Sequence, residues 1–180
     1  PEDVADAIEL RGVVEGTILR IAAERGPHRG ALAECRRVAD AIEAMLASHE
    51  PDVDFEAYTR LNAEFHDHLI RLAASPTLER EAARIYRLPL ASPNAFLQSQ
   101  AHLRQVRRSL FVAQSHHRAM LDAVAAREGA RAEALAREHA RLARENLQAL
   151  TGPETRLANT IPGLSLVKGP DISSMKGRIS

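Results

Sequence analysis

The residues with the clearest potential for chemistry are three histidines and one asparagine, namely His66, His117, His139 and Asn62. Asn62 and His66 are four positions apart, so on a helix they lie one above the other on the same face. His117 and His139 each fall at or beside the apolar stripe of a separate helical stretch. Three imidazoles and one side-chain oxygen brought together inside a helical bundle make a transition-metal site.

The chemistry of such a site follows from its ligands. Imidazole suits zinc, nickel, copper and iron, and affinity alone does not choose among them; we expect zinc or nickel. Asn62 brings no charge, so a divalent ion keeps its full charge where an aspartate would reduce it. That excess of positive charge favours an anion beside the metal. In an octahedral ion, positions remain for water or for the oxygens of an effector carboxylate.

Positions one or two helical turns from these ligands are candidate effector contacts. Gln114 lies three residues before His117, Tyr58 lies four before the asparagine, and Asn146 lies seven after the last histidine. The remaining histidines lie off the apolar stripes or in breaks between helices, and we expect no ligation from them. These are His28, His49, His68, His102 and His116.

The elements that must position these residues are helices. Apolar periodicity and helix breakers predict helices over about 4–24, 29–48, 55–74, 77–87, 95–127 and 130–150. Asp54 is predicted to cap the third helix, and the two prolines in 88–94 predict a loop. The sequence therefore predicts an all-α, antiparallel bundle of about six helices in one domain over 1–150. An irregular tail is predicted over 151–180, with a possible short strand at Leu164–Val167.

Composition narrows the class of protein further. The 180 residues hold 24 basic and 24 acidic side chains, and this balance disfavours direct nucleic-acid binding. The single cysteine, Cys35, excludes an internal disulfide, and no apolar run or signal sequence indicates a membrane. We therefore expect a cytoplasmic protein. A local basic patch is interpreted as a solvated helix face, and it consists of Arg104, Arg107 and Arg108.

Four segments of the chain match short sequence patterns that occur in a particular order and spacing. Residues 62–66 read Asn-Ala-Glu-Phe-His and match Asp/Asn-x-x-Phe-His, and His117 to Val124 follow a later pattern of a histidine, then Leu/Ile, then Ala-Ile/Val. Residues 131–139 form an Ala-rich helix with a single inward histidine, and 9–16 place an arginine before a Val-Glu pair. In these features the chain resembles the C-terminal effector-binding domain, of the FCD type, of GntR-type transcriptional regulators in the FadR-like group.

The resemblance covers roughly residues 4–150, and the six predicted helices with Leu88 to Phe96 look closer to a vanillate-repressor-like branch. It implies that His66, His117 and His139 hold the metal, with Asn62 where many relatives have aspartate. It also implies that Arg11 faces inward and clamps a carboxylate bidentately. The alternative for Arg11 is an ion pair with the glutamate four residues later, and the sequence leaves both open.

The functional expectation is ligand sensing without catalysis. The effector is expected to be a small organic acid, and the domain is expected to be a homodimer. DNA binding would come only through an N-terminal winged helix-turn-helix that these 180 residues do not contain. Two alternatives stay open: a metal-free helical interaction module, and then a mononuclear metalloenzyme. Against the enzyme, no placed general base or nucleophile motif accompanies the histidines, and no Glu-x-x-His motif occurs.

Overall fold

The computed structural model describes residues 2–47, 53–88, 91–95 and 104–151. Within these ranges the chain is helical and contains no strand, which confirms the predicted all-α class. No helix in the described part of the chain has the length and apolar character needed to cross a bilayer. The helices are α1 (Glu2–Arg25), α2 (Arg29–Leu46), α3 (Phe55–Leu69), α4 (Pro76–Ile85), α5 (Arg104–Ala125) and α6 (Gly129–Thr151).

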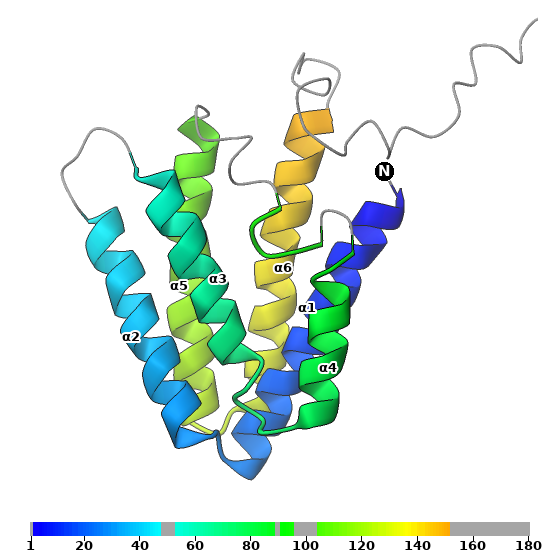
Figure 1. Cartoon of the computed structure of the whole chain (residues 1–180), viewed down its shortest axis with the longest axis vertical. Helices are drawn as coiled ribbons and strands as arrows, with labels where there is room; N and C mark the ends of the chain where they lie inside the picture. The colour runs from blue at the N-terminus through cyan, green and yellow to red at the C-terminus, as the bar shows by residue number, and fades with distance from the viewer. Residues whose placement is uncertain (1, 48–52, 89–90, 96–103, 152–180) are drawn as a thin grey trace, which may run out of the picture.

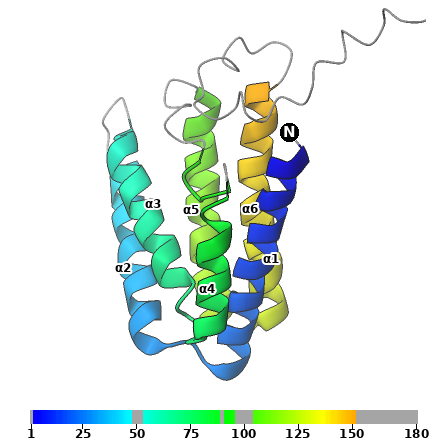
Figure 2. The ribbon, with the colours of Figure 1, turned by 45° about the vertical axis from the view of Figure 1, so that its right-hand side comes forward.

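The helices form a bundle in which sequence-distant elements are neighbours. Helices α1 and α6 run side by side in opposite directions along one side of the bundle (Figures 1 and 2). On the other side α2 packs against α3, while α5 contacts α1, α2 and α6. Helix α4 lies against α1. The candidate ligands come from α3, α5 and α6, so the bundle interior is where they can meet.

Local sequence signals explain where the helices begin. The predicted cap Asp54 accepts a hydrogen bond from the Ala57 amide at 2.9 Å. Ser75 caps α4 in the same way, with Pro76 directly after it, where its missing amide hydrogen costs nothing. His28 caps α2, because its Nδ1 accepts from the Ala31 amide at 3.2 Å. His28 therefore has a structural role at this helix start.

The apolar core is centred on α2 and its neighbours. Cys35, Val38 and Ile42 are completely buried along the predicted face of α2. They pack in one cluster with residues of the other helices, including Phe65 from α3 and Leu121 from α5. Burying each large apolar side chain contributes about 1.5–3 kcal/mol. This core fixes α3 and α5 against each other, and these helices carry two of the candidate ligands.

Helices α1 and α6 approach each other unusually closely at two glycines. A Cβ atom on Gly12 would lie 2.9 Å from the Cβ of Ala140, and one on Gly16 would lie 3.1 Å from atoms of Glu133. No other residue type fits these positions without moving a helix. The contact brings the buried Arg11 and Glu15 of α1 close to the part of α6 that carries His139.

Some predicted boundaries differ from the observed ones. Helix α3 ends at Leu69 and not near Ala74, because residues 70–73 form tight turns and Ala74 takes a positive φ of 47°. The Leu72 carbonyl in these turns accepts from the His28 amide at 2.9 Å. The predicted fifth helical region begins too early, since residue 95 lies in a turn. The irregular tail beyond 151 and its short strand lie outside the described residues.

Candidate metal centre

The structure brings His66, His117 and His139 together in the interior of the bundle. Each imidazole is at most 7% exposed, and one ring nitrogen from each lies within 4.8 Å of the others. His66 comes from α3, His117 from α5 and His139 from α6. The ring centroids of His117 and His139 are 4.7 Å apart, and those of His66 and His139 are 5.4 Å apart. The packing of three separate helices thus produces one cluster.

The orientation of His66 is set by a buried carboxylate from α1. His66 Nδ1 lies 3.0 Å from Glu15 Oε1, and both side chains are almost completely buried. The same oxygen accepts a hydrogen bond of 2.6 Å from the Tyr86 hydroxyl. Because the carboxylate can only accept, Nδ1 of His66 carries the proton, which leaves the Nε2 lone pair free.

His117 is oriented by an amide in an equivalent way. The Gln114 amide nitrogen donates to the Ala39 carbonyl at 2.7 Å, so its oxygen is the atom that faces His117 Nδ1 at 3.2 Å. His117 therefore donates from Nδ1 and presents the Nε2 lone pair. Hydrogen bonds of this kind fix the tautomer and ring orientation of metal-binding histidines.

The free ring nitrogens fit a metal ion. His66 Nε2, His117 Nε2 and His139 Nδ1 are buried and have no hydrogen-bond partner among the described residues. Unpartnered polar atoms inside a protein are costly, and three at one place require an explanation. Nitrogens bound to one tetrahedral zinc ion at about 2.0–2.1 Å are about 3.4 Å apart, so only small side-chain movements are needed. The donor set therefore fits a borderline-soft divalent ion.

Electrostatics keep the cluster ready for a cation. Burial, together with the neighbouring imidazoles, lowers the pKa of His117 and of His139 well below the ordinary value, so both rings are neutral. For Glu15, burial would raise the pKa, but the His66 charge and hydrogen bond, the Arg11 charge and the Tyr86 hydrogen bond together lower it to about 2. The cluster thus holds the neutral rings of His117 and His139 beside an ionised carboxylate.

A small, partly open chamber adjoins the cluster. It has a volume of about 40 Å³, enough for a few water molecules, and His139 lies in its wall. Four residues predicted from the sequence also line it, namely Arg11, Tyr58, Asn62 and Asn146. Arg11 is 2% exposed; its Nη1 donates to the Ala91 carbonyl at 3.2 Å, while its Nε has no partner among the described residues. A buried guanidinium with an unused donor fits an anionic ligand.

The two sequence interpretations of Arg11 are thereby separated. In the described part of the chain, no hydrogen bond or ion pair joins Arg11 to Glu15, although their charges interact. Arg11 faces the chamber, and Glu15 faces His66. This arrangement supports the inward orientation of Arg11 that the resemblance to the family implied.

Not every sequence-predicted residue lies in the chamber wall. Gln114 contacts Nδ1 of His117, so it orients this candidate ligand, and it is not among the residues that line the chamber. Two large apolar residues of α5 also lie outside the chamber wall, since Phe111 is 46% exposed and Met120 is part of the core. His116, for which no role was expected, has a ring centroid 6.1 Å from that of His139 and a buried, unpartnered Nδ1.

Sequence reasoning missed three residues that orient the site. Glu15 and Tyr86 hold His66, and Asn94 holds Asn62 through a hydrogen bond of 2.8 Å. Glu15 carried one available signal, since it lies four residues after Arg11 on the same helical face as the buried Ile8. Tyr86 and Asn94 carried none, because they lie at and beyond the end of α4, where no periodicity predicts orientation.

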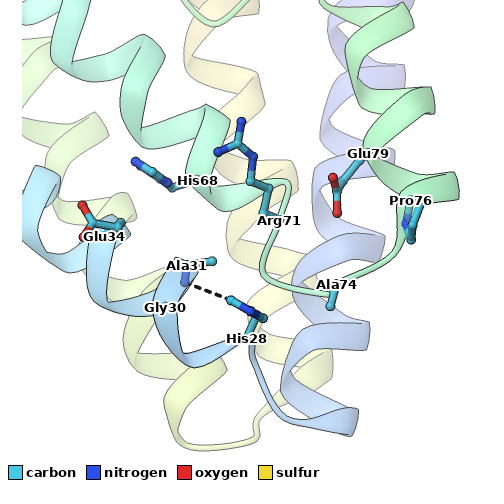
Figure 3. A pocket seen from close by; sticks show the side chains of 9 residues that line it. All are labelled: His28, Gly30, Ala31, Glu34, His68, Arg71, Ala74, Pro76 and Glu79. Atoms are coloured by element: carbon cyan, nitrogen blue, oxygen red, sulfur yellow. Dashed lines mark hydrogen bonds between the residues drawn. The ribbon is translucent and has the colours of Figure 1, made fainter.

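A larger hollow on the surface has a different character. It has a volume of about 480 Å³. Its lining residues come from the α1–α2 and α3–α4 connections and the helix ends beside them (Figure 3). These connections lie at the end of the bundle far from the start of α1 (Figure 1). Its charged residues are of both signs, with His68 and Arg71 beside Glu34 and Glu79. No buried, unpartnered side-chain atom lies among its lining residues. The hollow therefore lacks the features that distinguish the histidine cluster.

A helical bundle with a buried imidazole cluster and an adjoining polar chamber has the features of a small-molecule binding site. A model of the FCD domain family matches residues 6–142, and the chain belongs to this family. The match supports a ligand-sensing regulatory domain of GntR-type regulators, which are not enzymes. No curated protein matches the chain.

Proposed function

We propose that this domain senses a small carboxylate effector at a divalent metal ion. His66 Nε2, His117 Nε2 and His139 Nδ1 would hold the ion, with Asn62 as a fourth ligand. The observation that carries this proposal is the cluster of three buried imidazoles: one ring nitrogen from each lies within 4.8 Å of the others, and each ring has a buried nitrogen without a hydrogen-bond partner among the described residues. The ion is proposed to be zinc or nickel, and it supplies a positive charge that attracts the effector carboxylate.

The shape of the chamber supports a small effector. Its volume of about 40 Å³ accommodates little more than a carboxylate group near Arg11. An outer recess of about 240 Å³ between α5 and α6 shares Ser109, Leu142 and Asn146 with it, so the body of an organic acid has room to extend outward. Arg108 in this recess is exposed and offers a second positive charge to an approaching anion.

The effector contacts assigned by this proposal are Arg11, Tyr58 and Asn146, with Gln114 acting through His117. Burial raises the pKa of the Tyr58 hydroxyl above its ordinary value, so the hydroxyl is neutral and can donate to a carboxylate. Asn146 donates to Ser109 Oγ at 3.2 Å across the α5–α6 boundary. An effector entering between these helices would meet this pair first.

The regulatory setting is also part of the proposal. The domain would act in the cytoplasm, as a homodimer, and would control DNA binding by an N-terminal winged helix-turn-helix outside these 180 residues, in a regulator of the vanillate-repressor-like branch. Effector binding needs to shift the two-state equilibrium by only about 1–3 kcal/mol. The apolar Leu110 of α5 is 1% exposed within the bundle and offers no surface to a partner, so the case for a dimer rests on two-fold operator symmetry. Light scattering tests the proposed dimer, because a mass near 20 kDa at micromolar concentration would be that of a monomer and would contradict it.

Metal content and thermal denaturation test the proposal directly. Protein purified without an affinity-tag metal should take up one zinc or nickel ion per chain, and organic acids should then raise its melting temperature. A ligand at a hundred times its Kd stabilises by about 2.7 kcal/mol. The acid-dependent shift should be smaller in His117→Ala. No metal uptake, or equal acid shifts in both proteins, would refute the proposal.

A further inference from the structure

We infer that Asn94 is a positioning residue that orients the Asn62 amide so that its oxygen, and not its nitrogen, is presented to the metal. The inference rests on the proposed metal site and concerns a residue outside the ligand set. Asn94 lies in the segment 91–95, which follows α4, and is half-buried. Such a residue is useful because the amide at position 62 can present either its oxygen or its nitrogen, and only the oxygen can bind a metal ion.

The orientation of Asn94 itself is fixed first. Its Nδ2 lies 2.8 Å from the carbonyl oxygen of Thr59, which can only accept a hydrogen bond. The nitrogen of the Asn94 amide must therefore face α3 at this point. Its oxygen is the atom that remains for Asn62.

The orientation of Asn62 follows from that of Asn94. Asn94 Oδ1 lies 2.8 Å from Asn62 Nδ2, and an amide oxygen can only accept, so Asn62 donates in this contact. Asn62 Oδ1 then has no hydrogen bond from the described residues and lies in a side chain that is 4% exposed. Asn62 is one helical turn from His66 and lines the chamber next to His139. Donation from the nitrogen also polarises the amide and increases the electron density on its oxygen.

The pair of asparagines is matched in a way that aspartate at position 62 would not be. A carboxylate offers two equivalent oxygens and needs no orientation. It also has no donor for Asn94 Oδ1, so the two acceptors would repel each other. Removal of Asn94 should therefore weaken metal binding when position 62 is Asn, and should leave it unchanged or strengthen it when position 62 is Asp.

A double-mutant cycle on the full chain tests the inference with Co²⁺ as the probe. The dissociation constant and the visible absorption of bound Co²⁺ are measured for the wild type, Asn62→Ala, Asn94→Ala, Asn62→Asp and Asn62→Asp/Asn94→Ala. Ser92→Ala, in the same segment, is the matched control. Loss of an outer contact to a ligand weakens metal binding by about 10–100-fold, so Asn94→Ala should weaken it by about tenfold and should alter the absorption as Asn62→Ala does. Ser92→Ala should bind as the wild type does.

The outcomes separate the inference from the proposed function. If Asn94→Ala weakens Co²⁺ binding equally with Asn and Asp at position 62, Asn94 only stabilises the segment and the inference is wrong. If Asn62→Ala or Asn94→Ala binds like the wild type while His117→Ala does not bind, the three-histidine site stands and the inference falls alone. If the wild type itself binds no Co²⁺, both are overturned.

Discussion

Histidines gather in two places in this molecule, and the two places differ in every property that matters for binding a metal. In the bundle interior, His66, His117 and His139 are buried and left with unpartnered nitrogens, and hydrogen bonds orient the first two of them. At the surface hollow, His28 caps a helix and His68 lies 4.0 Å from Glu64, with its side chain 21% exposed (Figure 3).

The difference shows that hollow size does not identify the site. The surface hollow is about 480 Å³ and the inner chamber about 40 Å³. Exposed polar atoms in the hollow can satisfy their hydrogen bonds with water, whereas the interior nitrogens cannot. Unsatisfied polarity under burial is therefore the stronger indication of a ligand.

The largest expected effect is the loss of zinc affinity when one histidine of the interior cluster is removed. His117→Ala should weaken zinc binding by at least about 100-fold, because it removes one of three strong ligands, while His68→Ala should leave the affinity unchanged. Competition titration with a chromogenic chelator measures both. A similar loss in His68→Ala would mean that zinc binds at the surface hollow.

The next effect is a pH dependence of stability without metal. The pKa values of His117 and His139 are lowered by burial, so below about pH 6.5 the unfolded chain binds protons that the folded domain does not. The free energy of unfolding should therefore be at its full value above pH 6.5 and should decrease as the pH falls below it. Each histidine contributes a slope of up to about 1.4 kcal/mol per pH unit.

Urea denaturation of the metal-free protein between pH 7.5 and 5 measures this slope. His68→Ala should retain it, because the ring of His68 is partly exposed, and His117→Ala should reduce it. A slope that is the same in the wild type and in His117→Ala would show that the interior histidines do not cause it.

A smaller effect concerns the carboxylate that holds His66. Glu15→Gln keeps the size and an acceptor oxygen but removes the charge, so metal affinity should fall by about tenfold. Glu34→Gln at the surface hollow is the matched control and should change nothing. An unchanged affinity in Glu15→Gln would show that this carboxylate does not support the ligand.

The smallest effect concerns Cys35, which is buried in the apolar core and not at the histidine cluster. Burial raises the pKa of the Cys35 thiol to about 12, so at pH 8 the native protein should not react with a thiol reagent. One equivalent should react after denaturation. Rapid modification of the native protein would show that the α2 side of the core opens far more easily than the interior cluster.

The sequence predicted the helices and the candidate ligands because both leave periodic signals. Asn62 and His66 share a helical face by spacing alone, and the spacing of apolar residues located all six helices. The orienting residues could not be predicted in the same way. Tyr86 follows the last turn of α4 and Asn94 lies in a non-helical segment, so their directions depend on tertiary packing. The end of α3 at Leu69 likewise depends on contacts made by Leu72 with the start of α2.

The close approach of α1 and α6 at Gly12 and Gly16 has a mechanical consequence. With Ala140 and Glu133 against the glycine backbones, sliding or rotation of either helix would bring atoms into collision, so we expect these two helices to move together. This pair of helices carries Arg11 and His139, while α3 and α5 carry the remaining candidate ligands. If a ligand draws Arg11 and His139 toward His66 of α3, we expect α1 to move together with α6 relative to α3.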